Sequence, residues 1–144
     1  GTMGAAIEAA FYNIPSIGLS NLDHSDDADF EACIEYGIRI AKSVIDSDIR
    51  PLCLNVNVPI LPANQIKGVK VCRQTKGFWV DDVLERKDPY GQSYYWFTGG
   101  FQNAEPEATD TDEWALKNGY VAVVPVQVDL TSYAQLKAVT DILE

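Results

Sequence analysis

The segment between Phe30 and Ile45 constrains the fold more than any other part of the chain. Its apolar and small residues recur at the three- and four-residue spacing of one helix face, and Pro51 ends the segment. The residues of this predicted face are Phe30, Cys33, Ile34, Gly37, Ile38, Ala41, Val44 and Ile45. Residues 52–58 then alternate strictly, with Leu52, Leu54, Val56 and Val58 on one side, which predicts a β-strand. A helix is therefore followed by a strand.

The first 19 residues repeat this order. Residues 2–13 predict a helix rich in glycine and alanine, and residues 14–19 predict a short buried strand. Helices that alternate with strands, joined by connections long enough for crossovers, favour a mostly parallel sheet. We therefore expect part of a doubly wound α/β domain.

The middle of the chain has a different pattern. Residues 69–74, 78–84 and 93–98 are rich in β-formers and have no helix between them. The sequence 88–91, Asp-Pro-Tyr-Gly, has the residue chemistry of a type I turn. We expect a long antiparallel hairpin whose aromatic residues require a partner surface.

The last third predicts a helix, a strand and a second helix. Asp110 is the expected cap of a helix over residues 110–118, and Thr131 is the expected cap of the final helix. Residues 120–128 predict the last strand, in which Pro125 favours an edge or bulged position.

Composition excludes several classes of protein. The 144 residues are 47% hydrophobic, enough for one packed domain, and the formal net charge is -10. Such an acidic chain disfavours duplex nucleic acid and anionic membranes as partners. Its three cysteines predict reduced core thiols of a cytoplasmic protein, and its start does not resemble a signal peptide.

The start of the first predicted helix is the strongest candidate site. Gly1 and Thr2 precede its apolar residues, and free backbone N–H groups with the positive end of the helix dipole favour a phosphate there. The alternative is an N-cap threonine on a helix that packs tightly against its sheet.

Other polar residues have structural explanations that compete with functional ones. Residues 23–29 could hold a hard cation, but counted as an EF-hand loop they place Ala28 and Ile34 where glycine and glutamate are required, so a solvated helix cap is favoured. His24 is then a loop residue rather than a general base. Asn55 and Asn57 share a strand face, where buried pairing with the backbone competes with a catalytic role. Residues 110–112 similarly indicate a cap before a metal site.

Several ordered motifs together resemble the SurE family of stationary-phase survival proteins, which are 5'/3'-nucleotidases. The resemblance covers the whole chain. It rests on residues 1–8, 12–17, 54–59, 86–91 with 94–96 and 99–100, 110–112, 119–121 and 125–131.

The resemblance implies a Rossmann-like three-layer α/β core that here lacks its N-terminal strands, with a protruding antiparallel β-hairpin and a C-terminal helix. The single domain would comprise a core part (1–68), a hairpin arm (69–100) and a closing strand with the helix (101–144). Without the first strands, apolar faces of the early helices and of residues 14–19 would be exposed.

The resemblance also implies a function. It indicates a phosphomonoesterase that uses a divalent metal, Mg²⁺ or Mn²⁺, to hydrolyse nucleoside 5'/3'-monophosphates. Only Gly1 and Thr2 match phosphate-facing residues. No catalytic residue or metal ligand is expected in this chain, since the family's ligands would lie upstream of Gly1, so we expect the chain alone to bind no metal and to be inactive. A homodimer or homotetramer is expected, and the alternative is a non-catalytic association module that uses its β-arm.

Overall fold

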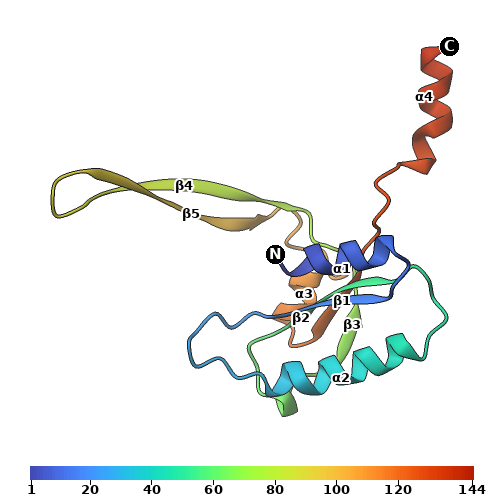
Figure 1. Ribbon diagram of the computed structural model, residues 1–144, viewed down its shortest axis with the longest axis horizontal. Helices are drawn as coiled ribbons and strands as arrows, with labels where there is room; N and C mark the ends of the chain where they lie inside the picture. Colours follow the sequence, from blue (N-terminus) through green and yellow to red (C-terminus); the bar gives the residue numbers. More distant parts are fainter.

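A four-stranded sheet organises the computed structural model, which describes residues 1–144 (Figure 1). The strand order is β1–β2–β6–β3; β1 pairs with β2 and β3 with β6 in parallel, whereas β6 runs antiparallel to β2. The strands are β1 (Ser16–Asn21), β2 (Cys53–Val58), β3 (Val69–Val71) and β6 (Val121–Pro125). The α/β class and the mostly parallel sheet are confirmed.

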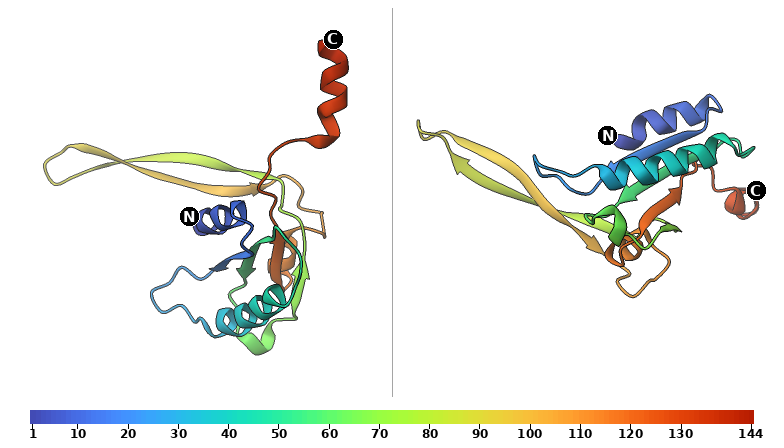
Figure 2. Two further views of the ribbon diagram at one scale, coloured as in Figure 1. Left: turned by 45° about the vertical axis from the view of Figure 1, so that its right-hand side comes forward. Right: turned by 90° about the horizontal axis from the view of Figure 1, so that it is seen from below.

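Helices cover both faces of this sheet, which gives three layers (Figures 1 and 2). The helix α2 (Glu31–Ile45) packs on one face, and the helices α1 (Thr2–Phe11) and α3 (Asp112–Lys117) pack on the other. The alternating strand β2 explains this sorting: Val56 and Val58 point to the α2 face, and Cys53 points to Ala6 and Ala10 of α1. A short 3-10 turn, η1 (Ala63–Gln65), leads into β3.

The largest core cluster lies between α2 and the sheet. It contains Val56 and Val121, which are fully buried, and a single stripe of α2. The stripe consists of Ala32, Cys33, Tyr36, Ile40 and Val44. The helix is confirmed, but its predicted face is only partly the buried one: Cys33 and Val44 belong to the stripe, whereas Ile34, Ile38 and Ile45 are exposed. The reason is that the sheet lies beneath the side of α2 that carries Ala32, Tyr36 and Ile40.

A long hairpin projects from this body (Figure 1). Its strands, β4 (Gly77–Lys87) and β5 (Ser93–Asn103), pair only with each other. Their large side chains are exposed on both faces: Phe78, Leu84 and Trp96 lie on one face, and Trp79 and Phe97 on the other. The observed hairpin therefore spans residues 77–103 rather than 69–100, because residues 69–71 join the central sheet.

The turn at the tip of the hairpin is confirmed. The Gly91 N–H donates to the Asp88 carbonyl at 3.0 Å, and the Asp88 carboxylate accepts from the backbone N–H groups of Tyr90 and Gln92. Gly91 has φ +81, a conformation that favours glycine.

The C-terminal segment leaves the body as well. It forms the 3-10 turn η2 (Tyr133–Gln135) and the helix α4 (Leu136–Leu143), which stand apart from the sheet (Figure 1). All its residues from Asp129 onward are exposed, including Leu136 and Val139. Thr131 does not cap α4: Asp129 accepts from its N–H, and the helix begins five residues later.

Two further predictions were wrong in detail. The strand β6 lies between β2 and β3, so Pro125 is not on an edge strand; it is tolerated because it is the last residue of its strand. The cap of α3 is Thr111 rather than Asp110, since the buried Thr111 hydroxyl accepts from the Trp114 N–H at 3.3 Å.

The three cysteines are buried and unpaired, as the sequence predicted. Burial raises the pKa of the Cys33 and Cys72 thiols, so both remain protonated at neutral pH. None of the helices is long and apolar enough to cross a bilayer.

Replacing Gly119 by alanine should destabilise the body. Gly119 has φ +79 between α3 and β6, and an added Cβ would lie 3.3 Å from the Leu61 Cδ1 atom. We expect a loss of about 1–2 kcal/mol in the free energy of unfolding, because an L-residue is strained there. Urea unfolding measures it, with Gly100→Ala as the control because that position has open space. Equal effects of the two substitutions would contradict this account.

Candidate phosphate site and arm root

The first turn of α1 lies directly over the end of β1. The Ser16 hydroxyl donates to the Ala6 carbonyl at 2.6 Å, so Ser16, and with it Gly18 and Ser20, faces α1. A Cβ on Gly18 would meet the Met3 sulfur, which shows how closely the helix approaches the strand. The Ser20 hydroxyl donates to the Thr2 hydroxyl at 3.3 Å. The fold therefore brings Thr2 to the carboxyl end of β1.

Two asparagines extend this polar group onto β2. Asn55 lies opposite Gly18, and Asn57 lies opposite Ser20, on the same face of the sheet. Both are half-buried, and the Asn57 amide donates to the Asn55 side-chain oxygen at 3.3 Å. The asparagines thus pair with each other and not with the backbone, and Asn57 lies beside the strand end that carries Ser20.

The alternative of an N-cap threonine is wrong, because Thr2 is the first residue of α1, whereas the tight packing of this helix against the sheet is confirmed. Gly1 is the N-cap residue and makes no side-chain cap bond, so the first N–H groups of α1 have no side-chain acceptor. Hydroxyl and amide donors from Thr2, Ser20 and Asn57 gather at the same end of the sheet, and all are uncharged. We call these three residues with Gly1 the phosphate-facing group. Sequence reasoning missed Ser20, although its two-residue spacing from Gly18 was a usable signal.

Carboxylates of the acidic loop before α2 accept hydrogen bonds from nearby backbone N–H groups. Asp23 accepts from the Ser25 N–H at 2.9 Å, and this bond lowers the pKa of the Asp23 carboxyl. Asp29 accepts from the Glu31 N–H at 2.9 Å, at the start of α2. These contacts support the interpretation as a helix cap, and His24 is an exposed loop residue.

No three His, Cys, Asp or Glu side chains lie close enough together to hold a metal ion. The phosphate-facing group itself contains no carboxylate.

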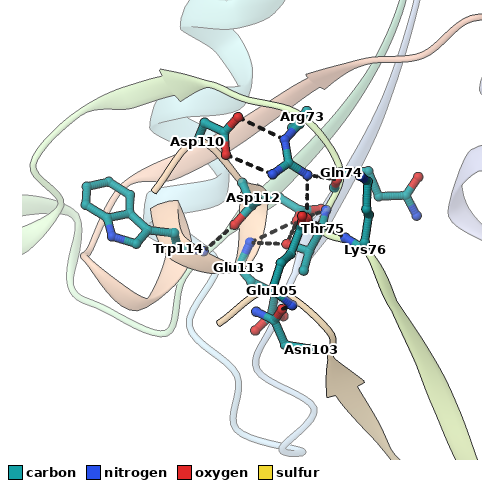
Figure 3. A network of polar contacts seen from close by, with 11 residues as sticks. Arg73, Gln74, Thr75, Lys76, Asn103, Glu105, Asp110, Asp112, Glu113 and Trp114 are labelled. Atoms are coloured by element: carbon teal, nitrogen blue, oxygen red, sulfur yellow. Dashed lines mark hydrogen bonds and ion pairs between the residues drawn. The ribbon is translucent and has the colours of Figure 1, made fainter. Parts of the chain in front are cut away.

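A second polar cluster fixes the root of the hairpin (Figure 3). Arg73 donates to both oxygens of Asp110, from Nε at 2.9 Å and from Nη2 at 3.0 Å, and it also bonds Glu105. Glu105 in turn accepts from the Lys76 N–H at 2.8 Å. Bonds from Arg73 lower the pKa of the Glu105 and Asp110 carboxyls, and the two carboxylates raise the pKa of Arg73.

The residues next to Arg73 tie the same root to α3. Asp112 accepts from the Thr75 N–H at 2.8 Å and from the Thr75 hydroxyl at 2.6 Å (Figure 3). Thr75 is buried although its neighbours are exposed. Residues 110–112 therefore form the start of α3, as the structural interpretation expected, and Asp110 and Asp112 also anchor the arm, which the sequence did not predict.

Sequence comparison finds known proteins that are similar to this chain. The family model described as "Survival protein SurE" matches residues 1–81. This chain belongs to the SurE family. It is 45% identical over 142 residues to a "5'-nucleotidase SurE" of Flavobacterium psychrophilum, covering 98% of this chain and 55% of the relative. It is 46% identical over 138 residues to the protein of that name from Phocaeicola vulgatus, covering 94% and 52%.

The SurE fold is confirmed by a solved structure. The crystal structure of the SurE protein from Aquifex aeolicus superposes with a TM-score of 0.75 at 35% identity, covering 99% of this chain and 57% of that one. The chain thus spans about half the length of the SurE relatives it matches.

Removing Arg73 should weaken, in a pH-dependent way, the polar cluster that fixes the root of the hairpin. The pKa values of Asp110 and Glu105 are lowered by folding, so their contribution to stability is present above the usual carboxyl pKa of about 4 and is lost as the pH falls through the lowered values. We expect Arg73→Met to lower the urea midpoint near pH 6 and to speed exchange of the Lys76 amide, with a smaller effect near pH 3.

Lys137→Met is the matched control, because it breaks an exposed ion pair with Asp141 in α4. An Arg73→Met effect that is the same at both pH values would show that the ion pairs do not hold the root.

Proposed function

We propose that this chain forms the phosphate-facing and assembly part of a SurE nucleotidase, which hydrolyses nucleoside 5'/3'-monophosphates to nucleoside and phosphate. The observation that carries the proposal is the position of Thr2 beside Ser20, at the carboxyl end of two parallel strands. Ligands of open α/β sheets bind at such strand ends. The names of the relatives, 5'-nucleotidase SurE, support the same reaction class.

The phosphate-facing group would orient the substrate by donating hydrogen bonds. Phosphoryl oxygens accept from the Thr2 and Ser20 hydroxyls and from the free N–H groups of the first turn of α1. Asn57 offers one more amide donor beside Ser20. These donors fix the position of the phosphoryl group but contribute no full positive charge.

The charge of the substrate supports a metal held by other residues. A nucleoside monophosphate brings about two negative charges to a chain whose own net charge is -10, and a helix N-terminus offers roughly half a positive charge. A divalent ion, Mg²⁺ or Mn²⁺, would supply the missing charge and polarise the phosphoryl group. We propose that its ligands lie in the part of a SurE protein that this chain does not span.

The exposed hairpin and α4 support self-association. Apolar side chains cover both faces of the hairpin, and α4 exposes Leu136, Val139 and Leu143. A monomer would leave this surface in water, so we propose a homodimer or homotetramer formed through these two arms. The free thiols are in keeping with the reducing cytoplasm.

The same arms favour a second candidate function. The protein could be a non-catalytic module whose function is to associate with other chains through its long apolar hairpin. The two functions predict different effects of removing the Thr2 hydroxyl. A nucleotidase would lose a hydrogen-bond donor to the phosphoryl group, whereas a non-catalytic association module would not need this donor.

Phosphate release from adenosine monophosphate tests the reaction. With Mg²⁺ or Mn²⁺ added, we expect none above background from the 144-residue chain, and turnover from a chimera in which the part of the Flavobacterium psychrophilum relative that this chain does not match precedes Gly1. In the chimera, Thr2→Val should lower kcat/KM by about 10-fold or more through loss of a donor, whereas Thr2→Ser should retain activity. Turnover by the 144-residue chain alone would contradict this assignment. An unchanged kcat/KM of the chimera after Thr2→Val would contradict it as well.

Light scattering tests the assembly. We expect a dimer or tetramer at micromolar concentration, and a smaller species when Trp96→Glu and Phe97→Glu place charges on opposite faces of the hairpin. The control pair, Ile49→Glu and Val71→Glu, lies at exposed positions of the body and should leave the mass unchanged. A monomeric unaltered chain would count against the arms as interfaces.

A further inference from the structure

The two asparagines of β2 lie on a part of the sheet whose neighbouring strand is apolar. Asn55 lies opposite Val124 of β6 and Asn57 lies opposite Ala122, and both of these β6 residues are buried against α3. Asparagine is a poor strand former, and an apolar side chain at position 55 would extend the buried surface beside Val124. Packing alone therefore does not account for Asn55.

The side-chain amide of Asn57 is held by Asn55. Its nitrogen donates to the Asn55 oxygen at 3.3 Å, and neither side chain makes another hydrogen bond. No buried side-chain nitrogen or oxygen lacks a partner, so the remaining amide atoms of this half-buried pair reach water. An asparagine nitrogen carries two N–H groups. One N–H group of Asn57 is used in this bond, and the second is free for a ligand.

The bond to Asn55 also fixes the direction of the free N–H group of Asn57. A carboxamide is planar, so orienting one N–H group orients the second N–H group and the oxygen with it. Without the Asn55 oxygen, the Asn57 amide could turn by about 180° around its last torsion, which has two roughly equal positions. Its oxygen would then replace the N–H group. Phosphoryl oxygens are hydrogen-bond acceptors, so they would be repelled by an amide oxygen at that place.

Asn57 stands between Asn55 and the phosphate-facing group. It lies opposite Ser20, whose hydroxyl donates to the Thr2 hydroxyl at 3.3 Å. Asn55 comes two residues earlier in β2 and lies opposite Gly18, further from the strand end. Asn55 can therefore act on a phosphoryl group beside Thr2 by way of Asn57.

We propose that Asn55 is a positioning residue of the phosphate-facing group, whose side-chain oxygen holds the Asn57 amide with an N–H group directed at the phosphoryl group of the substrate. This role rests on the proposed function, because it belongs to the same site. The Asn57 N–H bond is made to the bound substrate as well as to the transition state. Its loss therefore raises KM more than it lowers kcat.

Steady-state kinetics of the chimera described above test this role with adenosine monophosphate and Mg²⁺ or Mn²⁺. Asn55→Leu removes the acceptor oxygen, so KM should rise about 5-fold while kcat stays within about twofold. Gln127→Leu is the matched control. It removes an exposed amide close to the start of β2, where Val126 donates to the Cys53 carbonyl, and it should change neither value.

A double-mutant cycle separates positioning from direct contact with the substrate. Asn57→Leu should raise KM by itself, and the addition of Asn55→Leu should then have almost no further effect, because Asn55 acts only through the Asn57 amide. The urea midpoint of the 144-residue chain should be equal or higher after Asn55→Leu, since the oxygen serves the site and not the packing.

Two further measurements do not require turnover. NMR relaxation of isotope-labelled side chains in the 144-residue chain should show a more mobile Asn57 amide after Asn55→Leu, and an unchanged one after Gln127→Leu. Calorimetric titration of the chimera with inorganic phosphate should show about 5-fold weaker binding after Asn55→Leu.

An unchanged KM after Asn55→Leu, in a chimera whose kcat/KM falls after Thr2→Val, would overturn the positioning role and leave the proposed function standing. Additive effects of Asn55→Leu and Asn57→Leu would overturn it as well, and so would an Asn57 amide that stays immobile without the Asn55 oxygen. A chimera with no turnover would count against the proposed function. Weaker phosphate binding together with a mobile Asn57 amide would still support the role of Asn55 in that case.

Discussion

The close approach of α1 to β1 determines what the carboxyl end of the sheet can do. Gly18 leaves room for the Met3 side chain, and Ser16 bonds the Ala6 carbonyl, so the helix axis is fixed against the strand at two points. Thr2 then falls within hydrogen-bond distance of Ser20. A larger residue at position 18 would push the first turn outward and separate these hydroxyls. The close placement of Thr2 and Ser20 is therefore a consequence of helix–strand packing rather than of a binding loop.

The fold leaves a large part of its apolar surface unburied. Its core is complete between α2 and the inner strands, where Val56, Val58 and Val121 are buried. Beyond β1, along the hairpin and on α4, apolar side chains face water. The three regions differ in geometry. β1 is an open edge of the sheet, the hairpin is a ribbon with two exposed faces, and α4 is an isolated helix. They therefore call for partner surfaces of different shape.

Local periodicity predicted the elements of the body but not always the face that each buries. The alternation of β2 specifies an orientation without knowledge of the tertiary fold, whereas α2 is apolar over so wide an arc that its buried side depends on where the sheet lies. The place of β6 was not predictable in this way, because Pro125 disfavours a central strand unless it is the terminal residue, and strand order depends on contacts far apart in sequence. Ser20 was missed for a related reason: its role follows from its register opposite Asn57 and from the helix above it.

The polar cluster at the root of the hairpin connects the hairpin to the face of the sheet on which α1 and α3 pack. Arg73 lies between β3 and β4, and its partners Glu105 and Asp110 lie between β5 and α3, so both ends of the hairpin meet at one guanidinium. Asp112 adds a second fixed point through Thr75, at the start of α3. A two-stranded ribbon held at only one of these points could swing, and its apolar faces would meet a partner in many orientations. Two anchors on one side of the sheet limit that freedom, so the direction of the arm is set by the same layer that contains α1. In an assembly formed through the arms, the arrangement of the partner bodies would then be defined relative to Thr2 and Ser20.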